Sequence, residues 1–415
     1  AFVPLYSEYE GKQDNVRSQE FLNAITGILV FTLFIFTLIF LIFAPIFIFF
    51  FAPGFYFDPV KQDISVQVLR IMFPYLALIS LVALAGGIQN THQKFSVPAL
   101  TPVISNLSLI MAALFIAPKY DMPIYVLAWS VLLAGFLQLI IQIAPLRSIK
   151  RLPIPKLNFQ NEGIKKFFEV IFPAILAGGI IQINLLVDTI FASLLETGSP
   201  TWLYVSDRLV QFPLGIFAIA IGTVLLPTLS KLDANKERIA FNNTIKKGQR
   251  FVLFIGIPSL IGLMFCAEDL ISTIFYRGAF TEVDVFNSSM SLMAFSMGLP
   301  FFMLMKVLTP AFFARKDTKT PMFVAIISLV LNASLNYLLA FVLNFGHVGI
   351  AIGSSVAALV SVLILEGILY KDGFIKMHGV INRFNIMILF SSIALIVFLY
   401  FFTSMTNFMN FNQPQ

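Results

Sequence analysis

The stretch TWLYVSDRLVQFPLGIFAIAIGTVLLPTLS, residues 201–230, has the composition of a membrane-spanning helix, yet Asp207 and Arg208 stand side by side within it. Apolar stretches long enough to cross a bilayer, about 20 residues each, recur along the chain on both sides of it. Of the 415 residues, 58% are hydrophobic and only 12% are charged, whereas a soluble protein carries about 25% charged residues. The sequence therefore predicts an all-α polytopic membrane protein.

Hydropathy and helix breakers predict about eleven spans along the chain. The predicted spans are 21–50, 65–89, 98–117, 123–146, 167–195, 201–227, 248–275, 286–313, 321–345, 348–370 and 384–403. Short loops rich in turn-forming residues join them, such as APGFYFDP at 52–59 and LETGSP at 195–200.

Basic residues gather in alternate loops of this span order. Of the 27 lysines and arginines, one set of loops holds 21 and the other set holds 3, while 3 lie inside or at the edge of spans. Loops enriched in Lys and Arg face the cytoplasm, so we expect the basic loops to be cytoplasmic. The net charge of +6 then follows from topology and does not indicate a nucleic-acid partner.

The chain carries a weak internal repeat. VPLYS at 3–7 resembles LPTLS at 226–230, and QKFSVP at 93–98 resembles KDTKTP at 316–321, both at an offset of 223. Span order and loop charge also match at this offset, which predicts two parallel repeats of the kind found in transporters. We divide the chain into an N-terminal lobe at 1–150, a C-terminal lobe at 151–372 and the start of an appended C-terminal helix pair at 373–415.

The first repeat is shorter than the second. Two predicted spans precede Pro227, whereas only three residues precede its counterpart, Pro4. We therefore expect the first lobe to lack its first two helices here, about sixty residues with their loops. Complete, the molecule would have two pseudo-symmetric six-helix lobes that enclose a central cavity between them.

Arg208 lies at the centre of a polar helical face. Positions spaced by three and four share one face of a helix, which here groups Thr201, Tyr204, Arg208, Gln211 and Gly215. A guanidinium presents a planar fork suited to carboxylate or phosphate oxygens, so we expect Arg208 to line a cavity for an anionic substrate. The alternative is that Asp207 neutralises Arg208, although adjacent residues do not face each other on a helix. We expect Asp207 to orient a neighbouring helix or to gate the lobes.

Other polar residues inside spans are further candidates. Asp188 lies towards the outer end of its span, where it either lines the same cavity or reaches the interface. Lys306 is deeper and either binds a phosphate or pairs with an acid. We predict interhelical hydrogen bonds for Asn106, Asn332 and Asn336. The candidate substrate-binding residues are thus Arg208, Asp207, Thr201, Gln211, Lys306 and Asp188.

Several kinds of chemistry find no support in the sequence. The single cysteine, Cys266, and three widely separated histidines offer no cysteine-cluster metal site and no paired catalytic motif. No phosphate-binding loop of an ATPase is present. We therefore predict a transporter rather than an enzyme, with no cofactor apart from a coupling ion whose identity stays open.

Four segments carry a resemblance to a known family. GSPTWLYVSDRLVQFPLGIFAIAIGTVLLPTLS at 198–230 resembles the signature segment of the MurJ (MviN) family of lipid II flippases. FFARKDTKTP at 312–321, FAPGF at 51–55 and AFVPLYSEY at 1–9 are similar to further family segments, and the likeness runs along essentially the whole chain. The resemblance implies the fold of the multidrug/oligosaccharidyl-lipid/polysaccharide transporter superfamily, with fourteen helices in two lobes.

The resemblance also implies a function and a location. A member of this family would move lipid II, the undecaprenyl-pyrophosphate-linked peptidoglycan precursor, from the inner to the outer leaflet of the bacterial cytoplasmic (inner) membrane. It would do so by alternating access through a cationic central cavity, in peptidoglycan biosynthesis. Its partners would be the lipid II headgroup and polyprenyl tail and membrane lipids, with no nucleic acid. One chain is enough for a two-lobe carrier, and contact with cell-wall synthesis machinery is left open.

The resemblance assigns residues one by one. Arg208 matches the arginine that follows the aspartate in the family's eighth helix, and Asp207 and Thr201 align with polar positions of that segment, although Thr201 stands where a serine is expected. The family's other cavity arginines lie in the first two helices, before residue 1 of this sequence.

Alternative functions stay open at this point. One is a flippase for another polysaccharide-linked lipid, or a drug/cation antiporter of the same superfamily. An antiporter would favour acidic rather than basic cavity residues. A membrane-embedded transferase would need clustered acidic metal ligands or a catalytic histidine, and a scaffold for cell-wall enzymes would not depend on Arg208.

Overall fold

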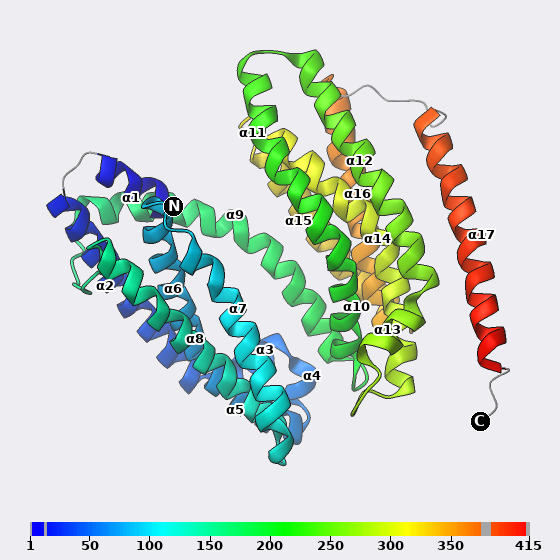
Figure 1. Cartoon of the computed structure of the whole chain (residues 1–415), viewed down its shortest axis with the longest axis horizontal. Coiled ribbons are helices and arrows are strands. Elements are labelled where there is room, and N and C mark those ends of the chain that lie inside the picture. The colour runs from blue at the N-terminus through cyan, green and yellow to red at the C-terminus, as the bar shows by residue number, and fades with distance from the viewer. Residues whose placement is uncertain (1, 12–14, 375–382, 412–415) are drawn as a thin grey trace. The chain divides into compact units, whose positions relative to one another are not determined.

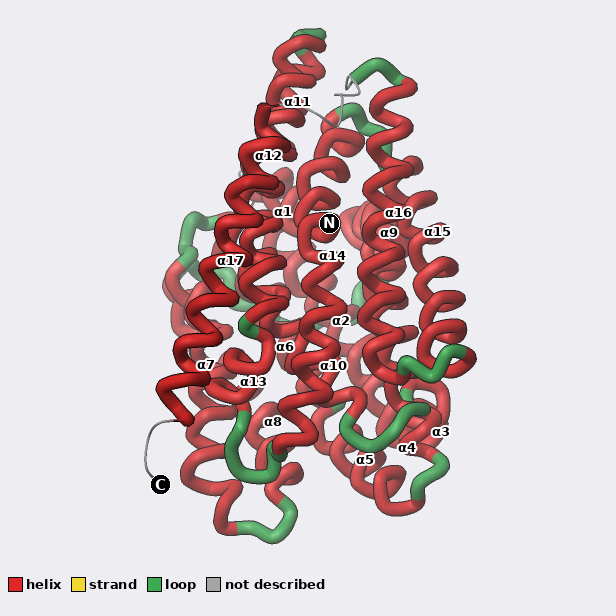
Figure 2. Tube along the Cα trace, turned by 90° about the vertical axis from the view of Figure 1, so that its right-hand side faces the viewer, coloured by secondary structure: helices red, strands yellow, loops and turns green. Residues whose placement is uncertain are grey.

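The protein is almost entirely helical. The computed structural model describes residues 2–11, 15–374 and 383–411, and it contains no strand in these ranges (Figure 2). The backbone contacts divide the chain into two compact units, unit 1 at 1–179 and unit 2 at 180–415. The division falls inside α9 (Glu162–Ser193), which belongs to both. Each unit is described by itself below.

Unit 1 is built from short and long helices in succession (Figure 1). Proline stands in the first turn of several of them, where its missing N–H costs no hydrogen bond. Its elements before α9 are α1 (Phe2–Gly11), α2 (Asn15–Ile42), α3 (Ala44–Phe51), α4 (Pro53–Tyr56), α5 (Pro59–Met72), α6 (Pro74–Thr91), α7 (Ser96–Met111), η1 (Ala112–Ile116), η2 (Ala117–Lys119) and α8 (Pro123–Ser148).

In unit 2, the three elements α10, η3 and α11 follow one another without a break. The helix that carries Arg208 continues from α10 through the π-helical segment η3 into α11. Its elements after α9 are α10 (Ser199–Pro213), η3 (Leu214–Ile219), α11 (Ala220–Ala234), α12 (Arg238–Phe265), α13 (Ala267–Phe275), α14 (Glu282–Ala314), α15 (Lys319–Asn336), η4 (Tyr337–Val342), α16 (Gly346–Lys371) and α17 (Arg383–Phe411).

Helix bounds in the two units recur at the offset that the sequence repeat predicts. α2 begins at Asn15 and ends at Ile42, and α12 begins at Arg238 and ends at Phe265, each 223 residues later. The same difference of 223 residues holds for three further pairs, at both their first and their last residues. The pairs are α5–α6 with α14, α7–η2 with α15–η4, and α8 with α16. The helix bounds therefore support the internal repeat.

Nine helices are long and apolar enough to cross a membrane in the part of the chain that the structure describes. The prediction of an all-α polytopic membrane protein is thus confirmed. Two predicted spans are wrong in their bounds. The span at 21–50 is broken after Ile42, where Pro45 stands in the first turn of α3, and the helix of the predicted span at 248–275 ends at Phe265. α13 follows it as a separate helix with Glu268 and Asp269 in its first turn, where acids favour a helix start.

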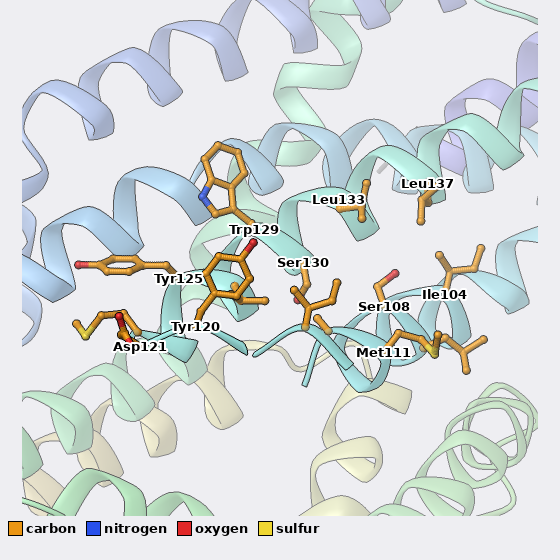
Figure 3. A pocket seen from close by; sticks show the side chains of 15 residues that line it. Ile104, Ser108, Met111, Tyr120, Asp121, Tyr125, Trp129, Ser130, Leu133 and Leu137 are labelled. Carbon is orange, nitrogen blue, oxygen red and sulfur yellow. The ribbon is translucent and has the colours of Figure 1, made fainter. Parts of the chain in front are cut away.

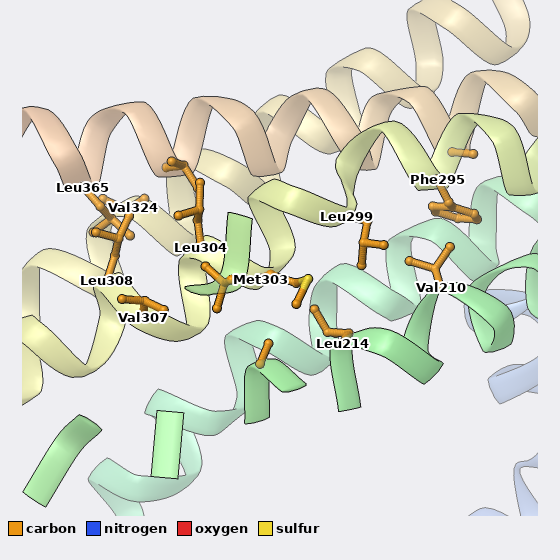
Figure 4. Close-up of a cluster of buried hydrophobic side chains, with 14 of the residues drawn as sticks. Val210, Leu214, Phe295, Leu299, Met303, Leu304, Val307, Leu308, Val324 and Leu365 are labelled. Atoms are coloured by element: carbon orange, nitrogen blue, oxygen red, sulfur yellow. The ribbon is translucent and has the colours of Figure 1, made fainter. Parts of the chain in front are cut away.

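α14 is the central helix of unit 2. It packs against α10, α11, α12 and α16, and its buried face includes Leu299, Met303, Val307 and Leu308 (Figure 4). Glycine lets α12 approach it closely, because a Cβ at Gly256 would lie 3.0 Å from the Met303 sulfur. The helix that carries Arg208 is therefore packed along a neighbour with an extensively buried face.

A polar cluster ties helices together at one end of unit 1. Glu10 on α1 forms an ion pair with Arg151, whose Nε lies 3.0 Å from Glu10 Oε1, and His92 Nε2 lies 3.0 Å from the Tyr6 hydroxyl. Burial acts to raise the pKa of Glu10, but hydrogen bonds from Ser18, Arg151 and Tyr6 and the charge of Arg151 hold it below its ordinary value. We call this end, where α2 begins at Asn15 and His92 directly follows α6, the basic end of unit 1.

Candidate functional site

α10 is fixed to α14 by its buried face. Trp202 Nε1–H donates a hydrogen bond of 2.7 Å to Asp284 Oδ1, and the Ser206 hydroxyl donates one of 2.6 Å to the Ser288 carbonyl. Asp284 also accepts hydrogen bonds from the backbone and hydroxyl of Thr281, so the same carboxylate caps α14 and holds α10. The Trp202 ring packs edge-on against the buried His347 of α16 at 4.8 Å.

This anchoring turns the polar residues of α10 away from α14. All five positions predicted to share a face are exposed in unit 2, and they are Thr201, Tyr204, Arg208, Gln211 and Gly215. The interleaved positions Trp202, Leu203, Ser206 and Val210 are buried. α10 therefore presents a polar face with Arg208 at its centre.

Arg208 is held by an aromatic ring rather than by a carboxylate. Its guanidinium carbon lies 4.6 Å from the centroid of the Tyr204 ring, one helical turn earlier. Arg208 makes no ion pair with any residue that the structure describes, whereas Asp207 accepts a long hydrogen bond of 3.4 Å from Gln211. A stacked guanidinium keeps its N–H donors available for an anion.

Asp188 on α9 is hydrogen-bonded to two other helices. Asn336 Nδ2 donates a hydrogen bond of 2.6 Å to Asp188 Oδ1, and the Ser354 hydroxyl donates one of 3.3 Å to Oδ2. Asn332 donates to Ser354 at 3.0 Å and accepts from Asn336 at 3.2 Å. α9, α15 and α16 therefore meet in one polar network inside unit 2.

The network has more acceptors than donors. Asn336 Oδ1 is buried without a hydrogen-bond partner among the described residues, next to the carboxylate that its own Nδ2 contacts. A carboxylate with amide and hydroxyl oxygens is a set of hard oxygen ligands. Such a set can accept a proton or a hard cation. Asp207 lies close enough to Asp188 for the two carboxylates to interact electrostatically, which increases the local negative charge.

Lys306 lies at a different depth from Arg208. A Cβ at Gly222 of α11 would lie 3.1 Å from the Lys306 carbonyl oxygen. Lys306 and Gly222 are therefore at the same level along the helices. Gly222 follows Arg208 by 14 residues on one continuous helical run, which is about 20 Å at 1.5 Å per residue. Lys306 and Arg208 therefore lie at different levels of unit 2.

The predicted site residues do not line the apolar cavity of unit 1. A cavity of about 1080 Å³ lies between α7 and α8 of unit 1. Its lining is mainly apolar, with Tyr120, Asp121, Tyr125 and Trp129 at one end (Figure 3). It contains none of the six candidate residues, all of which belong to unit 2.

Sequence reasoning found part of this arrangement. The interhelical hydrogen bonds predicted for Asn332 and Asn336 are confirmed, and both side chains are fully buried. The one predicted for Asn106 is not found, because this residue of α7 is exposed and its side chain makes no hydrogen bond with the residues that the structure describes. Sequence reasoning missed that the partner of the two buried asparagines is Asp188 and that Ser354 completes the set. The spacing of the two asparagines, four residues apart in an apolar span, marked one face of α15, but nothing in one sequence indicates which helix packs against it.

Comparisons with known proteins agree over the whole chain. A family model described as "Lipid II flippase MurJ" matches residues 1–413. The "Probable lipid II flippase MurJ" of Haemophilus influenzae is 37% identical over 408 residues, which are 95% of this chain and 79% of that protein. The protein of the same description from Vibrio cholerae is 38% identical over 380 residues, 90% of this chain and 72% of that one.

Solved structures with the same fold include a member of that family and a more distant transporter. "Lipid II flippase MurJ, inward closed conformation" has a TM-score of 0.77 at 26% identity, covering 99% of this chain and 88% of that one. An inward-facing multidrug resistance MATE family transporter has a TM-score of 0.69 at 13% identity, covering 90% of this chain and 85% of that one. The second likeness concerns the fold alone.

Proposed function

The chain belongs to the MurJ family of lipid II flippases, and from that premise we propose that it moves lipid II from the inner to the outer leaflet of a bacterial cytoplasmic membrane. The exposed guanidinium of Arg208 carries the proposal at the level of the site. The six sequence candidates then divide into an anion-binding face on α10, with Arg208, Gln211 and Thr201, and an ion-responsive group that includes Asp188 and Asp207. Lys306 would contact the headgroup deeper in the membrane.

The substrate's chemistry explains why an arginine is needed there. A pyrophosphate carries several negative charges, and moving such a group through hydrocarbon is very costly unless charges and dipoles replace its water. Arg208 offers a bidentate fork in a fixed orientation because Tyr204 stacks on it. The polyprenyl tail can stay in lipid, so only the headgroup needs a polar path.

Alternating access is the mechanism we propose for the transfer, with Asp188 as the coupling site. Binding or release of a proton or cation at Asp188 would change the charge of the network that joins α9, α15 and α16. α9 leads directly into α10 through residues 194–198, so a shift of α9 would be felt at the polar face of α10.

The test uses the full-length gene in cells depleted of their own lipid II flippase. We expect wild-type protein to restore lipid II accessibility at the outer leaflet and Arg208→Ala to lower it by about tenfold or more, since a lost charge-assisted hydrogen bond costs about 1.5–3 kcal/mol. Arg208→Lys should give an intermediate result, because it keeps the charge and loses the fork.

The control is Arg277→Ala at matched membrane levels, which removes a positive charge from the exposed loop between α13 and α14. Failure of the wild type would assign the chain to another polyprenyl-linked substrate. Equal flipping by wild type and Arg208→Ala would remove Arg208 from the headgroup site.

A further inference from the structure

Phe374 lies between two arginines at one end of unit 2. The guanidinium carbon of Arg315 is 4.0 Å from the centroid of the Phe374 ring, and that of Arg238 is 4.7 Å from it. Phe241, which is buried, packs against the same ring at 5.4 Å. Arg238 begins α12 and Arg315 directly follows α14, so one aromatic ring holds the ends of two long helices.

The residues before Phe374 reinforce this attachment. Arg315 Nη2 lies 2.9 Å from Asp372 Oδ2, and Arg238 donates a hydrogen bond to the Asp372 carbonyl. Gly373 has a φ of +69°, and a Cβ there would lie 2.9 Å from Arg238 Nη2. A side chain at 373 would therefore be strained in conformation and would push Arg238 from the ring.

A second arginine–phenylalanine pair lies at the start of α17 (Arg383–Phe411). The guanidinium carbon of Arg250 is 5.3 Å from the centroid of the Phe384 ring, in the first turn of α17. Arg250 and Arg238 both belong to α12, which packs along α17 (Figure 1). α12 thus contacts an aromatic ring on each side of 375–382, the segment that joins α16 to α17.

The internal repeat shows that this attachment has a counterpart of different chemistry. Subtracting 223 from 238, 315 and 374 gives Asn15, His92 and Arg151, which meet at the basic end of unit 1 through Glu10. There the chain leaving α8 also returns to the preceding long helix, since Lys156 N–H donates a 3.0 Å hydrogen bond to the Asn23 carbonyl on α2. Both units therefore fasten the segment that leaves their last helix.

We propose that Arg250 is a positioning residue that fastens the start of α17 to α12 through Phe384, so that α17 moves with unit 2 as one body during transport. Arg238 and Arg315 support it by fastening Phe374, in the chain that leaves α16, to the ends of α12 and α14. Each cation–π contact contributes about 0.5–2 kcal/mol. Asp372 supplies the counter-charge at one ring only. The claim about transport rests on the proposed flippase function. The attachment of α17 to α12 can be measured separately.

The experiment replaces one cation–π contact by a covalent link. In a Cys266→Ala background, Arg250→Cys and Phe384→Cys are combined, and membranes are treated with a short bis-methanethiosulfonate, which joins the two thiols through disulfide bonds that a reductant cleaves. We expect the pair to cross-link, to flip lipid II less well than the background before treatment, and to recover flipping after it. Each single-cysteine variant, treated in the same way, controls for modification of one thiol alone.

Three outcomes would overturn the proposal. They are failure of the pair to cross-link, unchanged flipping in the uncross-linked pair, and loss of flipping on cross-linking that a reductant restores. The last would mean that α17 must move relative to α12. Cross-linking yield does not depend on flipping, so a wrong substrate would leave this measurement intact.

Two further variants separate attachment from folding. Phe374→Trp keeps an aromatic face for Arg238 and Arg315 and should retain flipping, whereas Phe374→Leu at the same membrane level should reduce it several-fold. Equal flipping by the two variants would mean that only the bulk of the side chain matters, and would also overturn the proposal.

Discussion

In the proposed mechanism, Asp188 serves transport as a coupling group. It is held by Asn336 and Ser354 from two other helices, beside a buried amide oxygen that has no hydrogen-bond partner among the described residues. Burying a carboxylate is costly unless it is neutralised or paired. A proton or cation would neutralise the carboxylate, which is why we assign coupling to this residue.

We predict that Asp188→Asn uncouples flipping from the ion gradients across the membrane. The change keeps the size of the side chain and removes its charge, so the fold should persist while the response to an ionophore disappears. Coupling free energies of about 1–3 kcal/mol correspond to about 5- to 150-fold effects. Flipping with and without ionophore and lipid II binding to the purified protein would be measured, with Asp121→Asn in an exposed loop as the control.

For Asp188→Asn, we expect lipid II binding equal to that of the wild type and flipping that no longer responds to the ionophore. An ionophore response equal to that of the wild type would place the coupling group elsewhere, and loss of binding would make Asp188 part of the headgroup site.

At the residue scale, sequence reasoning could find polar residues in apolar spans but not their partners. The face with Thr201, Tyr204, Arg208 and Gln211 follows from helical spacing, and all four side chains are exposed in unit 2. The contact between Asp188 and Asn336 joins residues 148 positions apart. Such a contact depends on which helices pack together, and hydropathy carries no information about that.

At the element scale, glycine decides how closely α16 packs against its neighbour. A Cβ at Gly349 would lie 2.7 Å from the Ala340 backbone nitrogen in η4, which cannot move without moving the helix. Asn336 occupies the space beside Gly353 in the same way. Close packing at small residues is a main source of association between helices in membranes.

We predict that Gly349→Ala lowers the stability of unit 2, whereas Gly367→Ala does not. Overpacking a tight contact costs about 1–3 kcal/mol, and the matched change at Gly367, on the same helix with nothing within 4 Å, should gain about 0.5–1 kcal/mol from helix propensity. The midpoint of thermal unfolding in detergent would be compared for the two variants and the wild type. A midpoint for Gly349→Ala at or above that of the wild type would show that α15 and α16 are looser than described.

Element positions were more predictable than element ends. The long spans follow from hydropathy because a bilayer requires them, but the break at α3 and the separation of α12 from α13 depend on local features. Pro45 and the acids Glu268 and Asp269 were visible in the sequence, yet each lies within an otherwise apolar stretch. Composition averaged over a span hides such single residues.

At the scale of the whole molecule, the placement of charge predicts which ends of the helices face the cytoplasm. Arg238, Arg315 and Lys371 gather at one end of unit 2, and Arg277 lies in a loop at the opposite end of α14. Basic loops are retained in the cytoplasm during membrane insertion. The end that holds Phe374 is therefore expected to be cytoplasmic.

Cysteine labelling tests this orientation. In a Cys266→Ala background, Arg277→Cys should react with a membrane-impermeant maleimide in intact spheroplasts, and Lys316→Cys should react only after permeabilisation. Lys316 is an informative position because it lies in the turn just after α14, outside any helix, with a φ of +60°. Labelling of Lys316→Cys in intact spheroplasts would invert the proposed topology.

The equal spacing of helix ends in the two units has a consequence for the history of the chain. Eight helix ends in unit 1 have counterparts in unit 2 at one constant difference of 223 residues. Any insertion or deletion fixed in one copy after the ancestral gene duplicated would have shifted every later difference. The loops have therefore kept their lengths while their side chains diverged, from Glu10 and Arg151 in one copy to Phe374 and its arginines in the other. Within this chain, the two copies thus share the reach of each loop between those helix ends and differ in its chemistry.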